Sequence, residues 1–300
     1  MTKAIALAAL VIFTANAQKK PDVVSQTVWS PKALKPTGWT GPHKPHTKLA
    51  DVLAAHKGQA NWAHLVVDDE HLNAQYIQMA PGQSTRRRMH PDTREWWVIQ
   101  SGQIRFPIDG QEPSVAKKGY LVQVPYRTLY KMETVGTEPS LRCEVNIAKA
   151  TSQYPSDEKP PDVPGYEFLK TAVGGQGRYE GGNRPFIDFA NVVNGTESQR
   201  RFIADDRAVS NIIFGDVAKL PPAKDADKGH FHPECAEFWV VLLGTIEYKM
   251  EGAGMIYATE GDIVYAPRMH WHRPRFGGTG NSARLAMNGY QDISHLFEAH

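Results

Sequence analysis

The sequence predicts an all-β protein built from two tandem copies of one antiparallel barrel, with few short helices. Three observations support this prediction. Apolar runs of about five residues, bounded by turn residues, recur along most of the chain. The 25 glycines and 21 prolines are more than a helical bundle would contain. In addition, the second half of the chain resembles the first, residue by residue, at one constant offset.

Length and charge narrow the expected function. A chain of 300 residues is long enough for two domains of roughly 150 residues each. The 34 basic and 32 acidic residues leave a formal charge of only +2, and no basic run is longer than the triplet at 86–88. A nucleic-acid partner is therefore not expected. We expect a small-molecule substrate, and a homodimer remains open.

The N-terminus has the pattern of a secretory signal peptide over residues 1–17. One lysine precedes an apolar run from Ala4 to Ala15, which is too short to span a bilayer, and Ala15-Asn16-Ala17 fits a cleavage site. No later apolar segment approaches the length that a membrane-spanning helix requires. We therefore expect an exported protein, periplasmic or secreted, with no membrane partner after cleavage.

Residues 18–47 contain five prolines and are expected to form an extended arm. The first barrel is expected over residues 48–150, beginning with a short helix at Leu49–Ala55. Its strands are expected at Ala63–Val67, Ala74–Met79, Glu95–Ile99, Gln103–Ile108, Tyr120–Val124 and Leu141–Ile147. Residues 151–165 are rich in proline and charge and are expected to form a linker.

The second barrel is expected over residues 166–300. Its one expected helix is Pro185–Val193, with proline in the first turn. Its strands are expected at Arg207–Phe214, Glu237–Leu243, Thr245–Met250, Met255–Thr259, Asp262–Ala266 and Arg284–Asn288.

One constant shift along the chain aligns the two copies without a gap. It superimposes His90 on His232, Glu95 on Glu237 and Trp97 on Trp239, and it also matches glycines and prolines in the turns. Unrelated strand-rich segments would not stay in register across turns. The repeat therefore predicts a duplicated domain.

Four residues of the second copy have the side chains of a metal site: His230, His232, Glu237 and His272. His230 and His232 are two residues apart, so on a strand they point to the same face. Glu237 is at an odd separation, so the segment around Pro233 must break the alternation. Three imidazoles and a carboxylate leave open positions around a divalent metal, as a catalytic site requires.

The spacings of these residues resemble the two motifs of the cupin superfamily: H-x-H-x4-E-x6-G at residues 230–244 and G-x5-P-x4-H at residues 261–272. The resemblance implies jelly-roll barrels (double-stranded β-helices) with one metal in the mouth, and a duplicated chain resembles bicupins such as quercetinase-like dioxygenases and oxalate decarboxylases. Met269 departs from the family, which often has glycine there. Glu234 is an alternative ligand, although the repeat register favours Glu237.

The first copy keeps His90 and Glu95 but has Arg88 and Tyr130 in place of the other two histidines. A guanidinium cannot ligate a metal. We therefore expect a degenerate site in which Arg88 pairs with Glu95 and replaces the metal's charge. A pocket in which Arg88 binds an anionic ligand remains open.

Aromatic residues near the metal motifs suggest an apolar pocket. The candidate lining residues are Trp239, Tyr248, Tyr265 and His270. The ordinary alternative is that they are barrel core. Whether Cys143 and Cys235 form a disulfide is open.

These features lead to three hypotheses. The first is an exported, metal-dependent dioxygenase acting on a small aromatic or enolisable substrate, with Glu237 as the catalytic base. The second is a non-oxidative decarboxylase or isomerase, and the third is a metal-anchored carbohydrate- or organic-acid-binding protein. One divalent transition metal per chain is expected, with iron or copper favoured and manganese, nickel or zinc also compatible.

Overall fold

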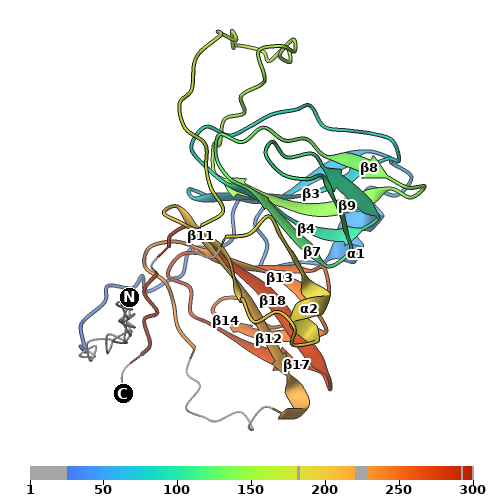
Figure 1. Ribbon diagram of the computed structural model, residues 1–300. Coiled ribbons are helices and arrows are strands. Elements are labelled where there is room, and N and C mark those ends of the chain that lie inside the picture. Colours follow the sequence, from blue (N-terminus) through green and yellow to red (C-terminus); the bar gives the residue numbers. More distant parts are fainter. Residues whose placement is uncertain (1–25, 181–182, 220–228, 292, 299–300) are drawn as a thin grey trace, which may run out of the picture. The chain divides into compact units, whose positions relative to one another are not determined.

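A computed structural model describes residues 26–180, 183–219, 229–291 and 293–298. The expected signal peptide lies outside these residues. Ala33–Glu298 form one compact unit, shown in Figure 1, and residues 26–32 of the N-terminal unit contain no helix or strand. Within the described residues, no helix is long and apolar enough to cross a membrane.

The first barrel consists of a six-stranded and a three-stranded antiparallel sheet. The six-stranded sheet has the order β10-β7-β4-β9-β3-β2, and the three-stranded sheet has the order β6-β5-β8. The strands are β2 (Trp62–Asp68), β3 (Leu72–Met79), β4 (Glu95–Ser101), β5 (Gln103–Phe106), β6 (Ser114–Lys117), β7 (Tyr120–Val124), β8 (Glu133–Val135), β9 (Ser140–Ile147) and β10 (Phe186–Asp188).

The second barrel repeats this arrangement. Its sheets have the orders β1-β16-β13-β18-β12-β11 and β15-β14-β17. The strands are β1 (His46–Thr47), β11 (Arg201–Asp205), β12 (Ala208–Asp216), β13 (Glu237–Leu243), β14 (Thr245–Met250), β15 (Gly254–Thr259), β16 (Ile263–Ala266), β17 (His272–Gly277) and β18 (Asn281–Asn288). The chain is thus mostly β, and the expected fold class is confirmed.

The two barrels pair their strands in the same register. Glu95 lies opposite Asn146 in the first barrel, and Glu237 lies opposite Asn288 in the second. Both pairs are related by the constant offset of the sequence repeat. Each position of one barrel can therefore be compared directly with its counterpart in the other.

The barrels exchange one strand each. β1 comes from the arm before the first barrel but pairs with β16 of the second barrel. β10 follows the linker but pairs with β7 of the first barrel. The range 166–300, which we assigned to the second barrel, therefore contributes a strand to the first.

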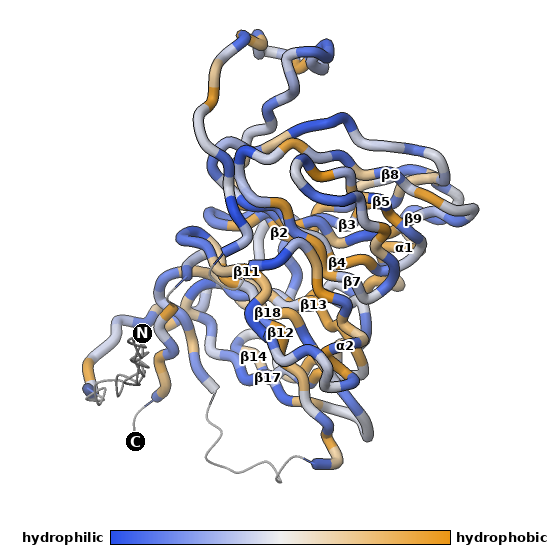
Figure 2. The backbone as a smooth tube through the Cα atoms, in the orientation of Figure 1, coloured by the Kyte–Doolittle hydropathy of each residue, from blue (hydrophilic) through white to orange (hydrophobic). Residues whose placement is uncertain are grey.

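Alternating side chains of the strands fill three separate cores. On β4, Trp97 and Ile99 point into the first barrel, whereas Trp96 and Val98 point the other way. Trp239 has the position of Trp97 and lies in the core of the second barrel. The third core joins the outer faces of both six-stranded sheets. Strands such as β4 and β13 are therefore buried on both faces, and Figure 2 shows that they are rich in hydrophobic residues.

The helix α1 (Leu49–Ala55) has the predicted bounds. The predicted helix at Pro185–Val193 is corrected, because its first half is strand β10. The helix α2 (Phe189–Val193) begins only where the Asp188 side chain accepts a hydrogen bond from the Ala190 amide. A short 3-10 helix, η1 (Val217–Lys219), was not predicted.

The departure from the family motif at Met269 has a backbone counterpart. Met269 has a φ of 68°, in the left-handed region that favours glycine. The equivalent residue of the first barrel, Arg127, has a φ of 56°. Both copies thus keep the turn conformation without the glycine.

Candidate metal centre

Backbone pairing brings His230 and His272 side by side at the mouth of the second barrel. The His230 amide donates to the His272 carbonyl (3.0 Å), and the His272 amide donates to the His230 carbonyl (2.9 Å). A bend at residues 233–234 breaks the extended chain before β13, as the odd spacing requires, and Glu237 then begins that strand. His232, Glu237 and His272 are buried, and His230 is half-buried.

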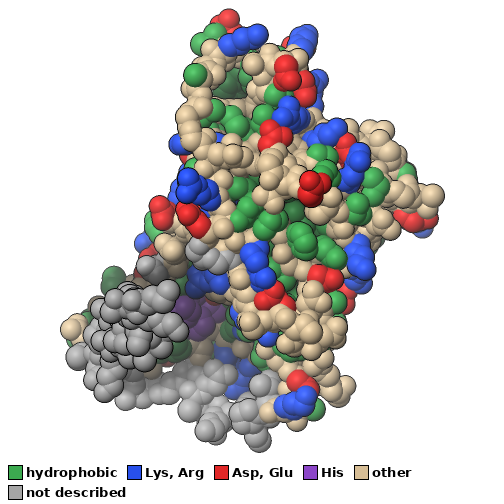
Figure 3. Space-filling model, viewed as in Figure 1, with side chains coloured by type: hydrophobic (Ala, Val, Ile, Leu, Met, Phe, Trp, Pro, Cys, Tyr) green, Lys and Arg blue, Asp and Glu red, His purple; other side chains and the backbone are tan. Residues whose placement is uncertain are grey.

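The four predicted ligands form a single cluster. One ligand atom from each of His230, His232, Glu237 and His272 lies within 4.8 Å of all the others. Ligands of one ion at about 2.0–2.2 Å can be roughly 3–4 Å apart, so small side-chain movements would bring these atoms onto a common centre. Figure 3 shows histidine side chains at the back of a hollow on one face of the molecule.

Hydrogen bonds to the protein backbone orient two of the imidazoles. His232 Nδ1 lies 2.8 Å from the Ser294 carbonyl, and His272 Nδ1 lies 2.9 Å from the His270 carbonyl. Because a carbonyl only accepts, each Nδ1 carries a proton, and each ring turns its Nε2 inward.

Both Nε2 atoms face the same carboxylate. Glu237 Oε2 lies 2.9 Å from His232 Nε2 and 3.1 Å from His272 Nε2. Neutral imidazoles and a carboxylate repel one another in this arrangement unless a proton or a cation lies between them. The donor set therefore fits a divalent metal held by the three histidines and Glu237.

Burial and neighbouring charges shift the pKa values in the cluster. Burial and the neighbouring His272 lower the pKa of His230 to about 3. Burial opposes ionisation of Glu237, but hydrogen bonds from His232 and His272 hold its pKa well below the usual range. Burial also opposes protonation of His232, yet its hydrogen bond to Glu237 raises the pKa. Ionised Glu237 and neutral His230 are both in the form that binds a metal.

The C-terminal segment adds a residue that the sequence analysis missed. Leu296 forms a β-bridge with Phe231, and this bridge places the His295 ring 4.7 Å from His230 and 4.8 Å from His232. The first barrel has the same feature, since Gln153 bridges to Met89 and Thr151 accepts from His90. The only available sequence signal was a histidine in the tail, beyond both motifs.

The alternative ligand Glu234 lies outside the cluster. Its carboxylate accepts a hydrogen bond from the Ser294 amide at 3.3 Å, which fixes the C-terminal segment. The structure thus brings Glu237 to the cluster and gives Glu234 a different contact.

Two of the four predicted pocket residues, Trp239 and Tyr248, belong to the barrel core that lies against the cluster. Trp239 contacts His272 edge-on, with a ring distance of 5.1 Å, and Tyr248 packs on Trp239 at 5.0 Å. His270 lies against Trp39, and its Nε2 is buried without a partner in the described chain. Tyr265 does not line the site, because it lies opposite Phe238 and shares its face toward the core between the barrels.

The first barrel contains an ion-pair network at the corresponding place. Arg88 donates to Glu95 (2.8 Å), to the Tyr130 hydroxyl (2.8 Å) and to Glu144 (3.5 Å). His90 Nε2 lies 2.9 Å from Glu95. The predicted pairing of Arg88 with Glu95 is therefore present. Arg88 is held by side chains of its own barrel, so the alternative of an anionic ligand has no support from its contacts.

Both cysteines, Cys143 and Cys235, are buried as free thiols, so they form no disulfide.

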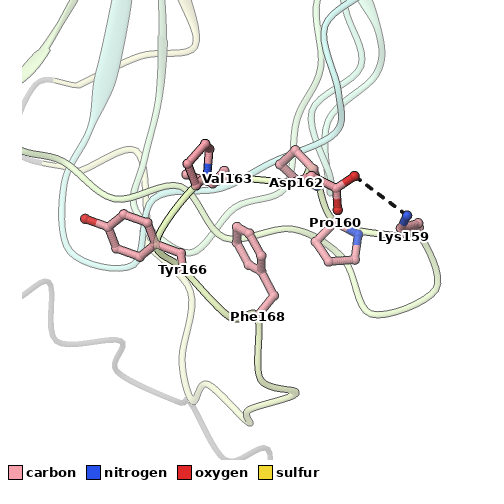
Figure 4. A pocket seen from close by; sticks show the side chains of 8 residues that line it. Lys159, Pro160, Asp162, Val163, Tyr166 and Phe168 are labelled. Atoms are coloured by element: carbon pink, nitrogen blue, oxygen red, sulfur yellow. Dashed lines mark ion pairs between the residues drawn. The ribbon is translucent and has the colours of Figure 1, made fainter.

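An open hollow in the predicted linker and the loop after it is lined by residues such as Lys159, Val163, Tyr166 and Phe168 (Figure 4). Its one ion pair, between Lys159 and Asp162, is exposed and 3.9 Å long. Metal-ligand residues do not gather there, so the hollow is unrelated to the histidine cluster.

The fold and the cluster define a class: two fused antiparallel barrels of which the second can hold a metal. The model of the cupin domain matches the sequence twice, at residues 75–145 and 216–287. The chain therefore contains two cupin domains.

Solved structures resemble the chain at low sequence identity. A cupin 2 conserved barrel domain protein from Leptotrichia buccalis is 12% identical, with a TM-score of 0.54 over 81% of this chain and 95% of that one. Oxalate decarboxylase from Bacillus subtilis at pH 4.6 is 16% identical, with a TM-score of 0.49 over 79% of this chain and 74% of that one. Such likeness shows the fold alone. Among curated proteins, none matches the sequence.

Proposed function

We propose that this protein is a metal-dependent oxidoreductase of the dioxygenase type, acting on a small organic substrate in the second barrel. The observation that carries the proposal is the convergence of three imidazoles and Glu237 on one point in a largely apolar barrel. A divalent transition metal bound there would supply a Lewis-acidic centre with open coordination positions.

The protein's own residues would then have distinct tasks. Backbone carbonyls orient His232 and His272, so that both present Nε2 to the same point. Trp239 and Tyr248 are buried and keep water from the inner side of the cluster. Oε2 of Glu237 contacts His232 and His272, and the other carboxylate oxygen, Oε1, would take a proton from a bound substrate.

We expect the substitution Glu237→Gln to retain much of the metal but to lose turnover by about 10²–10⁴-fold, the usual effect of removing a general base. Metal content and oxygen uptake would be measured together, with phenols and enolisable acids as substrates. The matched control is Glu234→Gln, three residues away, whose carboxylate contacts only the Ser294 amide among its recorded hydrogen bonds.

Turnover that is unchanged in Glu237→Gln would remove Glu237 as the base. Turnover that continues without oxygen would instead support the non-oxidative decarboxylase or isomerase. Binding of sugars or organic acids without any consumption would support the binding protein.

A further inference from the structure

A buried arginine in the second barrel has no acidic partner among the described residues. Arg284 of β18 is 7% exposed, and its Nε and Nη1 atoms have no hydrogen-bond partner among the described residues. Its guanidinium lies over the Phe276 ring, 5.4 Å from the ring centre. A buried cation that lacks an anion is costly, and proteins usually provide one. We therefore expect an anionic partner for Arg284 from outside the described residues.

The first barrel shows what such a partner looks like. Arg142 has the position of Arg284, and its Nε donates to Glu144 at 3.2 Å. The same carboxylate oxygen accepts from Trp97 Nε1 at 3.0 Å. Glu144 thus holds one carboxylate between an arginine and an indole inside the barrel.

The second barrel keeps both donors and lacks the carboxylate. Trp97 lies opposite Glu144 in the first barrel, and Trp239 lies opposite Ala286 in the second. Ala286 therefore stands where the first barrel has Glu144. The exchange removes the acidic group and replaces it with a small side chain in the core of the second barrel.

The surroundings of the two tryptophans are otherwise alike. Trp97 packs on Tyr130 and Phe106, both at 5.3 Å. Trp239 packs on their counterparts, His272 at 5.1 Å and Tyr248 at 5.0 Å. The change from Phe106 to Tyr248 adds a buried hydroxyl, and that hydroxyl also has no partner among the described residues. The second barrel thus gains a further donor where the first needs none.

The balance of charges inside the two barrels also favours an anionic ligand in the second barrel. In the first barrel, Arg88 and Arg142 are balanced by Glu95 and Glu144. In the second, Glu237 and Arg284 influence each other's charge but form no ion pair among the described residues, so a bound divalent metal would leave a net positive charge. Burial also lowers the pKa of Arg284 despite the attraction of Tyr248 and Glu237. An anionic ligand would remove this imbalance.

We propose that Arg284, Trp239 and Tyr248 form a carboxylate-binding subsite beside the metal ligands, and that the substrate is a small carboxylate whose acidic group takes the place that Glu144 fills in the first barrel. The ligand chemistry follows from the comparison of the barrels. That the ligand is a substrate rests on the proposed function.

The test uses the full-length, metal-loaded protein and titration calorimetry with acetate, pyruvate and benzoate, with acetamide and benzamide as neutral controls. We expect the wild type to bind one or more of the acids and to bind the amides more weakly. The substitution Arg284→Gln should weaken binding of the acid roughly 10- to 100-fold, the effect of losing a charged hydrogen bond, with an unchanged metal content.

A second pair of variants tests the position of the carboxylate. Ala286→Glu should abolish binding of the acid and raise the melting temperature, because it recreates the pair of Arg142 with Glu144. Ala286→Gln has the same size without the charge and should not raise the melting temperature. The proposal is overturned if Arg284→Gln binds the acids as the wild type does, or if Ala286→Glu and Ala286→Gln have the same stability.

These outcomes are separate from the failure of the proposed function. Binding is measured by heat and stability by melting, so neither depends on turnover. A protein that binds carboxylates through Arg284 but consumes no oxygen would retain the subsite and lose the dioxygenase.

Discussion

Replacement of Arg88 by methionine is expected to destabilise the protein by about 2–4 kcal/mol. Removal of one partner from a buried ion pair costs about 3–5 kcal/mol when the other charge is left alone. The expected value is lower here because Glu95 keeps His90, Glu144 keeps Arg142, and the Arg88 side chain is 22% exposed. Chemical denaturation monitored by fluorescence would measure the change in the free energy of unfolding.

The matched control is Arg87→Met, one residue earlier. Arg87 pairs with Asp109 at 2.8 Å, but the two side chains are 32% and 48% exposed, so the expected change is within about 0.5 kcal/mol. If the two variants lose the same stability, Arg88 does not stabilise the first barrel through its buried carboxylates.

Acid should reveal the same network. Burial tends to raise the pKa of Glu144, but the charges of Arg142 and Arg88 outweigh burial and lower this pKa to about 2. Because this pKa lies below that of the unfolded chain, ionised Glu144 stabilises the fold above about pH 4.5, and this stabilisation is lost as the pH falls toward 2. Stability in Arg88→Met should therefore fall less steeply over that range than stability in the wild type.

The substitution His272→Ala is expected to lower metal affinity by more than about 100-fold, since loss of an outer partner of a metal ligand alone costs about 10–100-fold. His272 is buried, and its Nε2 lies 3.1 Å from Glu237 in the centre of the cluster. Its loss leaves only two imidazoles to bind with Glu237. Metal retained after dialysis against a chelator, measured by elemental analysis, would report the change.

His270→Ala is the control, because it removes a neighbouring histidine that packs against Trp39 outside the four-residue cluster. The His270 carbonyl, which accepts from His272, is part of the backbone and is retained. Equal loss of metal in both variants would contradict the assignment of His272 as a ligand.

The repeat made most of the fold and the cluster predictable from the sequence. The constant offset between the copies predicted the duplicated domain and paired the positions of the two barrels, including Glu237 with Glu95 and Trp239 with Trp97. Tyr265 was misplaced because β16 is buried on both faces, so hydrophobicity could not tell the barrel interior from the core between the barrels.

Other features gave no clear local signal. β17 contains Pro274 and two arginines, a composition that argues against a strand. It is tolerated because β17 is at the edge of its three-stranded sheet. β1 has two residues, and its pairing with β16 depends on tertiary structure. His295 reaches the cluster through a single bridge of the tail, which no periodic pattern marks.

The difference between the barrels depends on a few positions that the alignment had already paired. Arg88 and Tyr130 stand where the second barrel has His230 and His272, and Glu144 stands where it has Ala286. The sequence alone indicated the first two exchanges. The third became informative only when the contacts showed Arg142 paired and Arg284 unpaired.

The most direct test of this account is the number of tightly bound metal ions per chain, measured by elemental analysis of the full-length protein. We predict one ion per chain, lost in His272→Ala and retained in Tyr130→Phe, which changes the equivalent position of the first barrel. Two ions per chain, or one ion that is lost when Tyr130 is changed, would contradict the conclusion that Arg88 has taken the place of a metal in the first barrel.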